Sequence, residues 1–216
     1  MKLVSVNVSP GRTVRWKGQD VETGIFKEPV SGPVRVGRHN LEGDRQSDLR
    51  VHGGEYKAVY AYSAEHYDWW RGELGRTLPF GTFGENLTIE GFPEEEVCVG
   101  DRFRIGSVVF EAVQPRFPCF KLGLKFGDDA IIQRFLDSER WGVYFRIIEE
   151  GILGVGSEVA RVSMDPARFP VPDVLRILLS ETKPRETLAR ALSARGLPPE
   201  WREKFTGMLG RAQEGA

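Results

Sequence analysis

One cysteine of the chain lies in a segment whose composition favours reactivity. Cys119 is part of Q-P-R-F-P-C-F-K, residues 114–121, directly after an apolar run that predicts a strand. Arg116 and Lys121 bring positive charge near the sulfur, and positive neighbours favour the thiolate, which attacks substrates and binds metals. The alternative is a buried, inert cysteine, and the local sequence leaves both open. Cys98 lies in an apolar strand, which predicts a core residue.

A second polar segment, residues 43–57, surrounds two adjacent glycines. Gly53 and Gly54 allow positive φ and a close approach of the backbone to a ligand. Basic side chains beside exposed backbone N–H groups suit a phosphate. A polar surface loop is the alternative. The candidate residues that this segment contributes are Asp44, Arg50, His52 and Lys57.

Two further segments each contribute one candidate. Asn86, in T-F-G-E-N-L-T, can hydrogen-bond a ligand amide or a phosphate, or it is an ordinary turn asparagine. Lys27 ends T-G-I-F-K, residues 23–27. An alternating strand there directs Lys27 into a cavity, whereas the alternative is a solvated lysine at a strand end.

The elements that must position these residues are mainly strands. Residues 1–8 alternate as a strand does, and hairpins are predicted around 18–19 and 106–107. Residues 143–148 and 155–162 form a third candidate pair. Many short strands and turns predict a mainly β fold, a closed β-barrel over residues 1–164, with accessory helices at 63–74 and after 128–129.

The chain changes character near residue 165. Three prolines at 166, 170 and 172 indicate a linker. Residues 173–179, 184–194 and 198–210 then predict three short helices. A small accessory domain over residues 165–216 follows. It is marginal alone, so it is expected to dock on the barrel or on a second copy in a homodimer.

Composition excludes several classes of protein. The 30 basic and 31 acidic residues of the 216 give a net charge of −1, so neither nucleic acid nor an anionic membrane is an expected partner. Two cysteines are too few for an all-cysteine zinc site or an ordinary iron–sulfur cluster. The sequence also shows no signal peptide and no apolar run of about 18 residues, which favours a cytoplasmic location.

Taken together, the motifs resemble the MOSC family, named after the C-terminal domain of molybdenum cofactor sulfurase, and its YiiM-type bacterial branch. The carrying motifs are T-G-I-F-K at 23–27, G-D-R-Q-S-D at 43–48, V-H-G-G at 51–54, K-A-V-Y at 57–60, G-E-N-L-T at 84–88, G-D at 100–101 and Q-P-R-F-P-C at 114–119. The resemblance covers most of residues 1–162, and the helical tail resembles the accessory domain of that branch.

The resemblance implies a MOSC-type barrel that binds molybdenum cofactor, a molybdopterin carrying molybdenum. It makes Cys119 the metal ligand and a catalytic residue, which suits a soft thiolate. Lys57 or Arg50 is expected to stabilise charge on a departing oxygen. The residues expected to hold the cofactor are Lys27, Asp44, Arg50, His52, Gly53, Lys57, Asn86 and Arg116.

The implied reaction is the reduction of N-hydroxylated bases such as 6-hydroxylaminopurine. Because the chain has no dinucleotide-binding motif and too few cysteines for a cluster, a separate reductase, a flavoprotein, is the expected electron donor. Two alternatives stay open. One is a sulfur carrier with a persulfide on Cys119, and the other is a non-catalytic cofactor-binding module.

Overall fold

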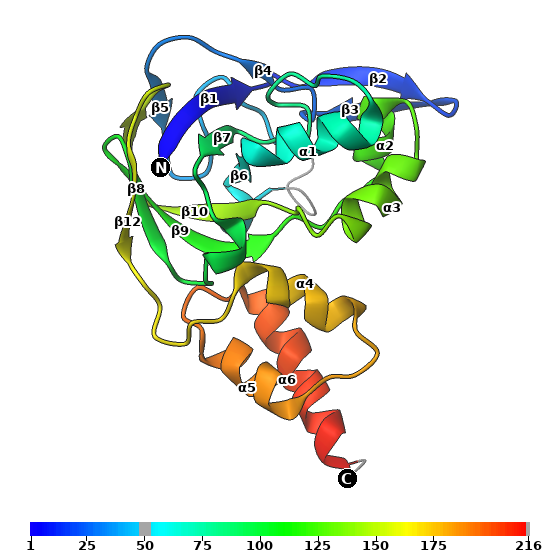
Figure 1. Cartoon of the computed structure of the whole chain (residues 1–216), viewed down its shortest axis with the longest axis vertical. Helices are drawn as coiled ribbons and strands as arrows, with labels where there is room; N and C mark the ends of the chain where they lie inside the picture. Colours follow the sequence, from blue (N-terminus) through cyan, green and yellow to red (C-terminus); the bar gives the residue numbers. More distant parts are fainter. Residues whose placement is uncertain (48–52, 215–216) are drawn as a thin grey trace.

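A large mixed sheet forms most of the fold (Figure 1). The computed structural model describes residues 1–47 and 53–214. Neighbouring strands of the sheet are antiparallel except β6 and β7, which are parallel. In spatial order the eight strands are β12 (Val159–Ser163), β8 (Arg102–Ile105), β9 (Val108–Pro115), β10 (Val143–Glu149), β6 (Val59–Ser63), β7 (Leu87–Glu90), β1 (Lys2–Val8) and β4 (Glu28–Pro29).

The prediction of a closed barrel is wrong. The sheet ends at β12 on one side and at β4 on the other, and these two strands are not paired with each other. β4 is only two residues long and contains Pro29, which has no N–H to donate to a further strand. The segment before β12 reaches β1 through single bonds, such as Leu3 N to Ser157 O at 3.0 Å, but this does not close the sheet.

The predicted pairing of residues 143–148 with 155–162 is also wrong. β10 lies between β9 and β6, and β12 pairs with β8. The short strand β11 (Gly151–Leu153) pairs with β5 (Val34–Val36) in a small sheet of its own. The predicted hairpins around 18–19 and 106–107 are confirmed, the first by β2 (Arg12–Trp16) and β3 (Gln19–Thr23).

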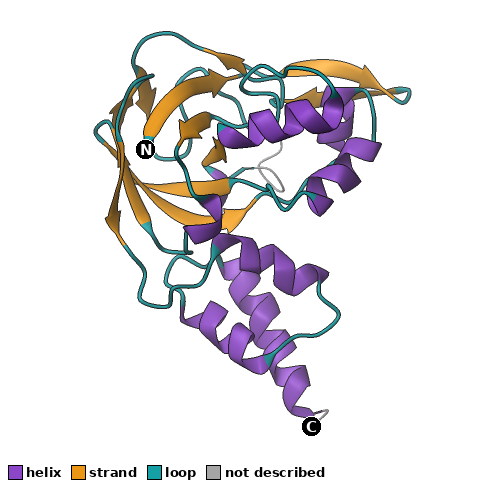
Figure 2. Ribbon diagram, viewed as in Figure 1, coloured by secondary structure: helices purple, strands orange, loops and turns teal. Residues whose placement is uncertain are grey.

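Helices cover one end of the sheet with an aromatic core (Figure 2). These are α1 (Glu65–Leu74), α2 (Phe120–Phe126) and α3 (Ala130–Asp137). Trp70 of α1 and Phe135 of α3 stack with ring centroids 6.4 Å apart. Both are fully buried, so the helices are fixed against the strands whose loops carry the candidate residues.

The C-terminal region contains the three predicted helices, α4 (Val171–Leu179), α5 (Arg185–Ser193) and α6 (Pro199–Glu214). They lie below the sheet in Figure 1. Leu188 and Phe205 are buried in the same apolar cluster as the sheet residues Phe103 and Phe110. The helices therefore share a core with the sheet, and the apolar surface that so small a piece cannot bury alone is covered here. Within the described residues, no helix is long and apolar enough to cross a membrane.

Candidate functional site

A single pocket collects most of the candidate residues. Lys27, Asp44, Lys57, Asn86, Arg116 and Cys119 all line it, although they come from widely separated parts of the chain. We call it the Cys119 pocket. The other lining residues are Thr23, Gly24, Ile25, Arg45, Gln46, Ser47, Tyr60, Gly84, Lys121 and Tyr144. Arg50 and His52 lie outside the described residues, and Gly53 is described but does not line the pocket.

The charge of the pocket is strongly unequal. Five of its lining residues are basic, and among the described ones Asp44 is the only acid. Phosphates and other anions are attracted to such a set of ammonium and guanidinium groups. The near-zero charge of the whole chain therefore conceals a local site that favours an anionic ligand.

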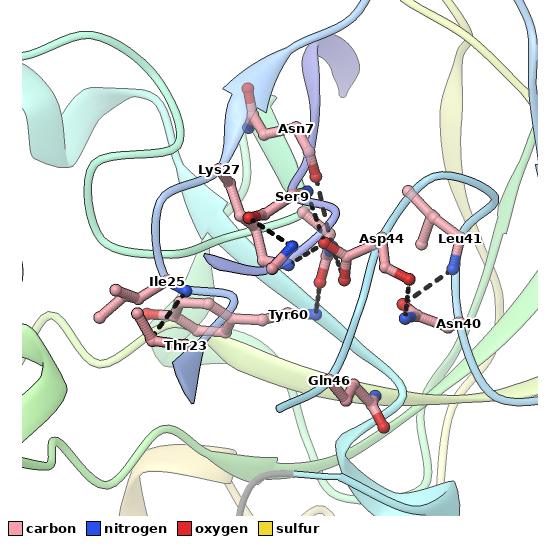
Figure 3. A network of polar contacts seen from close by, with 12 residues as sticks. Asn7, Ser9, Thr23, Ile25, Lys27, Asn40, Leu41, Asp44, Gln46 and Tyr60 are labelled. Carbon is pink, nitrogen blue, oxygen red and sulfur yellow. Dashed lines mark hydrogen bonds and ion pairs between the residues drawn. The ribbon is translucent and has the colours of Figure 1, made fainter. Parts of the chain in front are cut away.

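Asp44 is the centre of a buried polar network (Figure 3). Its carboxylate accepts hydrogen bonds from Lys27 Nζ, from Ser9 N at 2.8 Å and from Asn86 Nδ2 at 3.1 Å. The side chains of Lys27 and Asp44 are only 9% and 2% exposed. Burial lowers the pKa of Lys27, and Arg116 acts in the same direction, while Asp44 opposes both. Asp44 thus fixes the ammonium group and favours its charged form.

Asn86, just before β7, connects three segments. Its Oδ1 accepts from Tyr60 N at 3.1 Å, and its Nδ2 also donates to Asn7 O at 3.3 Å. These bonds join β6 to β1 and to the loop that carries Asp44. Both ends of the amide are engaged with the protein, so Asn86 shapes the wall of the pocket and holds Asp44 in place.

Arg116 follows β9 and is buried at the back of the pocket. Its guanidinium donates to Phe83 O and lies 5.0 Å from the centroid of the Tyr60 ring. Burial acts to lower the pKa of Arg116, but Tyr144 and Tyr60 outweigh it and the pKa is raised. Gly84 makes room for this group, since its φ is +76° and a Cβ there would lie 3.0 Å from Arg116 Nη1.

Cys119 is half-buried and directly precedes α2. The sequence analysis named no helix here; Pro115 and Pro118 both precede the cysteine, and the helix begins directly after it. In the structure the Cys119 carbonyl accepts the first helical bond, from Leu122 N at 2.9 Å. Lys121, the second residue of α2, donates from Nζ to Ser47 Oγ at 3.0 Å. The helix therefore directs a thiol and an ammonium group at the same pocket.

Lys57 ends the short 3-10 helix η1 (Glu55–Lys57). Gln46 holds this helix by donating from Nε2 to Lys57 O at 3.0 Å and by accepting from Gly54 N at 3.3 Å. On its outer side, Lys57 Nζ lies 3.4 Å from Glu200 Oε1 of α6. Lys57 thus lines the pocket from a segment tied to the C-terminal helices.

Comparison with known proteins identifies the family of the chain. A model of the MOSC domain matches residues 48–160, just over half of the chain. The chain belongs to the MOSC domain family. A model of the YiiM-like 3-alpha helix domain matches residues 170–211. The resemblance to the YiiM-type branch is therefore confirmed.

Relatives of this MOSC chain extend over nearly its whole length. Protein YflK of Bacillus subtilis is 39% identical over 94% of this chain and 92% of its own. Protein YiiM of Escherichia coli is 32% identical over 82% and 80%. The crystal structure of YiiM from Geobacillus stearothermophilus has a TM-score of 0.80 and 31% identity, and the similarity covers 96% of this chain and 98% of that one.

A protein of Gibberella moniliformis named "Reductase" is 30% identical over 74% of this MOSC chain. The matched part is only 29% of that protein's length. Its similarity therefore concerns one part of a much longer chain.

Glu85 does not line the pocket of this MOSC chain, but it lies between two residues that do, Gly84 and Asn86, and the sequence did not single it out. It is fully buried, and its Oε1 accepts from Tyr67 Oη, from Gly81 N at 2.7 Å and from Thr88 Oγ1 at 3.0 Å. Burial raises its pKa. Its Oε2 is the one buried side-chain atom without a hydrogen-bond partner in the part of the chain that the structure describes.

Among the described residues, no group of three or more histidine, cysteine and acidic side chains could hold a metal ion. The second cysteine, Cys98, is buried at 3% exposure, as its apolar strand context predicted. Cys119 is therefore the thiol that is accessible to a molecule bound in the pocket.

Proposed function

We propose that this MOSC protein binds molybdenum cofactor in the Cys119 pocket. The chemistry of the donor set supports this: a half-buried thiol stands beside five basic side chains. A thiolate is a soft ligand that suits a molybdenum already held by the sulfurs of its pterin. The basic groups suit the phosphate of that cofactor. Cys119 would be the protein ligand to the metal.

The proposed reaction is the reduction of an N-hydroxylated base. An N–OH group takes up two electrons and two protons, its N–O bond breaks, and an N–H bond and water form. When bound, the cofactor supplies the two electrons and a metal that accepts oxygen. The protein supplies the positions, the charge and a route for protons.

The basic residues divide these roles by their chemistry. Lys57 Nζ can stabilise charge on the departing oxygen and can donate a proton. Arg116 contributes only charge, because a guanidinium does not deprotonate at ordinary pH. Lys27, oriented by Asp44, holds the cofactor. Arg50 and His52 remain part of the proposal through the family resemblance alone.

The electrons come from a separate reductase under this proposal. The motifs for a dinucleotide fold and the cysteines for a cluster are both missing from the sequence. The Gibberella relative named a reductase supports the reaction class, and most of its length has no counterpart in the matched region. We infer that a flavoprotein partner in the cytoplasm fills this role.

Metal analysis tests the binding proposal. The protein is made in a host that synthesises the cofactor, and molybdenum and pterin are measured per chain. We expect about one molybdenum in the wild type and in the control Cys98→Ala, and loss of the metal in Cys119→Ala. Equal molybdenum in all three proteins would contradict the proposal.

Turnover tests the reaction. The loaded protein is mixed with NADPH, a flavoprotein reductase and 6-hydroxylaminopurine, and the formation of adenine is measured. We expect turnover that needs all components and disappears in Cys119→Ala. Turnover with NADPH and no added protein would show that the chain has its own route for electrons.

The half-exposed thiol among cations also supports a second candidate, a sulfur carrier. In that case Cys119 would carry a persulfide received from a sulfur donor. Mass spectrometry separates the two. A mass gain of one sulfur at Cys119 without bound metal favours the carrier. Bound molybdenum without turnover, even with a competent reductase, favours a non-catalytic cofactor-binding module.

A further inference from the structure

The first turn of α6 reaches the strands that carry the pocket. Trp201 Nε1 donates to Gln114 Oε1 at 2.6 Å, and Gln114 Nε2 donates to Tyr56 O at 2.8 Å. Gln114 is buried at 1% exposure. Each end of its amide therefore needs its partner, because an unsatisfied buried polar group is costly. A hydrogen-bonded relay thus runs from α6 to the backbone of η1.

A second link reaches the same short helix through a side chain. Glu200 Oε1 of α6 lies 3.4 Å from Lys57 Nζ. Tyr56 and Lys57 are consecutive residues, so α6 contacts η1 once at the backbone and once at the ammonium group. The other side of η1 is held by Arg146, which is 3.2 Å from Glu55 Oε1 and itself belongs to β10.

We propose that Glu200 and Trp201 are positioning residues that set the place of Lys57 in the Cys119 pocket. The three-helix region then contributes to the site, because it helps to position Lys57. Trp201 fixes the backbone of η1 through Gln114, and Glu200 limits where the ammonium group can turn. The catalytic consequence rests on the proposed function, whereas the placement of Lys57 does not.

Chemical labelling measures that placement without any activity. Lysines are acetylated competitively in the whole protein, and the rate at Lys57 is compared by mass spectrometry with the rate at the exposed Lys2. The variants are Glu200→Gln, which keeps the shape but loses the charge, and Trp201→Phe, which keeps a ring but loses the N–H. The control is Glu203→Gln, an exposed residue of the same helix.

We expect the relative rate at Lys57 to rise about two- to fivefold in Glu200→Gln, the range for a partly exposed ion pair. Trp201→Phe is expected to shift the rate in the same direction, and Glu203→Gln to leave it unchanged. With the loaded protein, kcat for the N-hydroxylated base should fall by a similar factor while KM stays nearly constant. Unchanged labelling in both test variants would overturn the proposal, whatever the activity shows. Changed labelling in a protein without turnover would support the placement and count against the proposed function.

Discussion

Two regions of this molecule contain the same ingredients, a cysteine, a buried carboxylate and basic side chains, yet they differ in what those groups face. The first is the Cys119 pocket. We call the second the Cys98 joint, made of Cys98, Asp101, Arg161, Asp165 and Arg168. Asp101 is fully buried there and accepts from Cys98 N at 3.2 Å and from Asp165 N at 2.9 Å.

The carboxylate of the joint is used by the chain itself. Arg161 and Arg168 lie 3.7 and 3.6 Å from Asp101, and the bonds to Cys98 and Asp165 tie the sheet to the linker before α4. Burial raises the pKa of Cys98, and Asp101 adds to it, so the thiol stays protonated. In the Cys119 pocket, by contrast, the sulfur and five basic residues line an open space. The two regions thus differ in what their polar groups face. Those of the joint bind one another, whereas those of the pocket line a space that a ligand can enter.

The largest effect is expected from removing the two carboxylates. Asp44→Ala leaves the buried Lys27 ammonium without its partner, so the free energy of unfolding should fall by about 3–5 kcal/mol. Asp101→Ala also destabilises, because two backbone N–H groups lose their acceptor. Denaturant midpoints measure both.

A second substitution is expected to restore the stability that Asp44→Ala loses. Adding Lys27→Met to Asp44→Ala should recover much of the lost stability, since the unpaired buried charge is then gone. If Asp44→Ala alone costs less than about 1 kcal/mol, the buried pair does not behave as an ion pair.

Two glycines give a smaller, matched effect. Gly84 in the pocket and Gly100 in the joint both have positive φ, and a Cβ would meet Arg116 Nη1 at 3.0 Å or Asp165 Oδ2 at 2.6 Å. Each alanine variant should lose about 1–3 kcal/mol of stability. Gly84→Ala should also lower the molybdenum content, whereas Gly100→Ala should not.

Gly18→Ala is the control for these variants, because its φ is +82° and no atom lies within 4 Å of the added methyl group. Gly18→Ala should lose only the stability that the strained positive φ costs. A Gly100→Ala protein that loses molybdenum as strongly as Gly84→Ala would remove the distinction between joint and pocket.

The smallest effect is expected in the pH dependence of stability. The pKa of Lys125 in α2 is lowered to about 8, chiefly by burial. Between pH 8 and 10.5 the unfolded chain binds more protons at this residue than the folded one, so its contribution to stability rises with pH. Unfolding midpoints of the wild type and Lys125→Met should therefore diverge in that window, with the wild type gaining.

In the Cys98 joint, the contribution of the thiol to stability should fall rather than rise with pH. The raised pKa of Cys98 means that the unfolded thiol loses its proton first, so stability falls as the pH rises above 9. Cys98→Ala should lack this fall. If Lys125→Met follows the wild type over the whole alkaline range, burial does not lower the pKa of that lysine.

Much of the site could be predicted from the sequence because its residues lie in short, distinctive motifs. Lys27, Asp44 and Arg116 were each chosen from a few neighbouring residues, and they meet in one pocket. Glu85 was overlooked, because nothing in the neighbouring residues T-F-G-E-N-L-T indicates a buried carboxyl. Its burial and its orphan oxygen exist only after folding.

The fold could be predicted less completely. Strands and hairpins depend on local alternation, and two of the three predicted hairpins were found, whereas the short strands β4, β5, β7 and β11 were not predicted. The pairing of distant strands, such as parallel β6 and β7, depends on contacts that no local pattern encodes. For the same reason the open ends of the sheet were mistaken for a closed barrel. Helix α2 was missed because Gly123, which packs against Asp129 where a Cβ would lie 2.5 Å from Oδ1, weakens its helical pattern.

The central claim is that Cys119 ligates molybdenum, and X-ray absorption at the molybdenum edge tests it most directly. Selenocysteine is introduced at position 119 in one protein and at position 98 in another, and both are loaded with cofactor. Our account predicts a molybdenum–selenium contact in the first protein and none in the second. Loaded protein with no such contact at position 119 would contradict it.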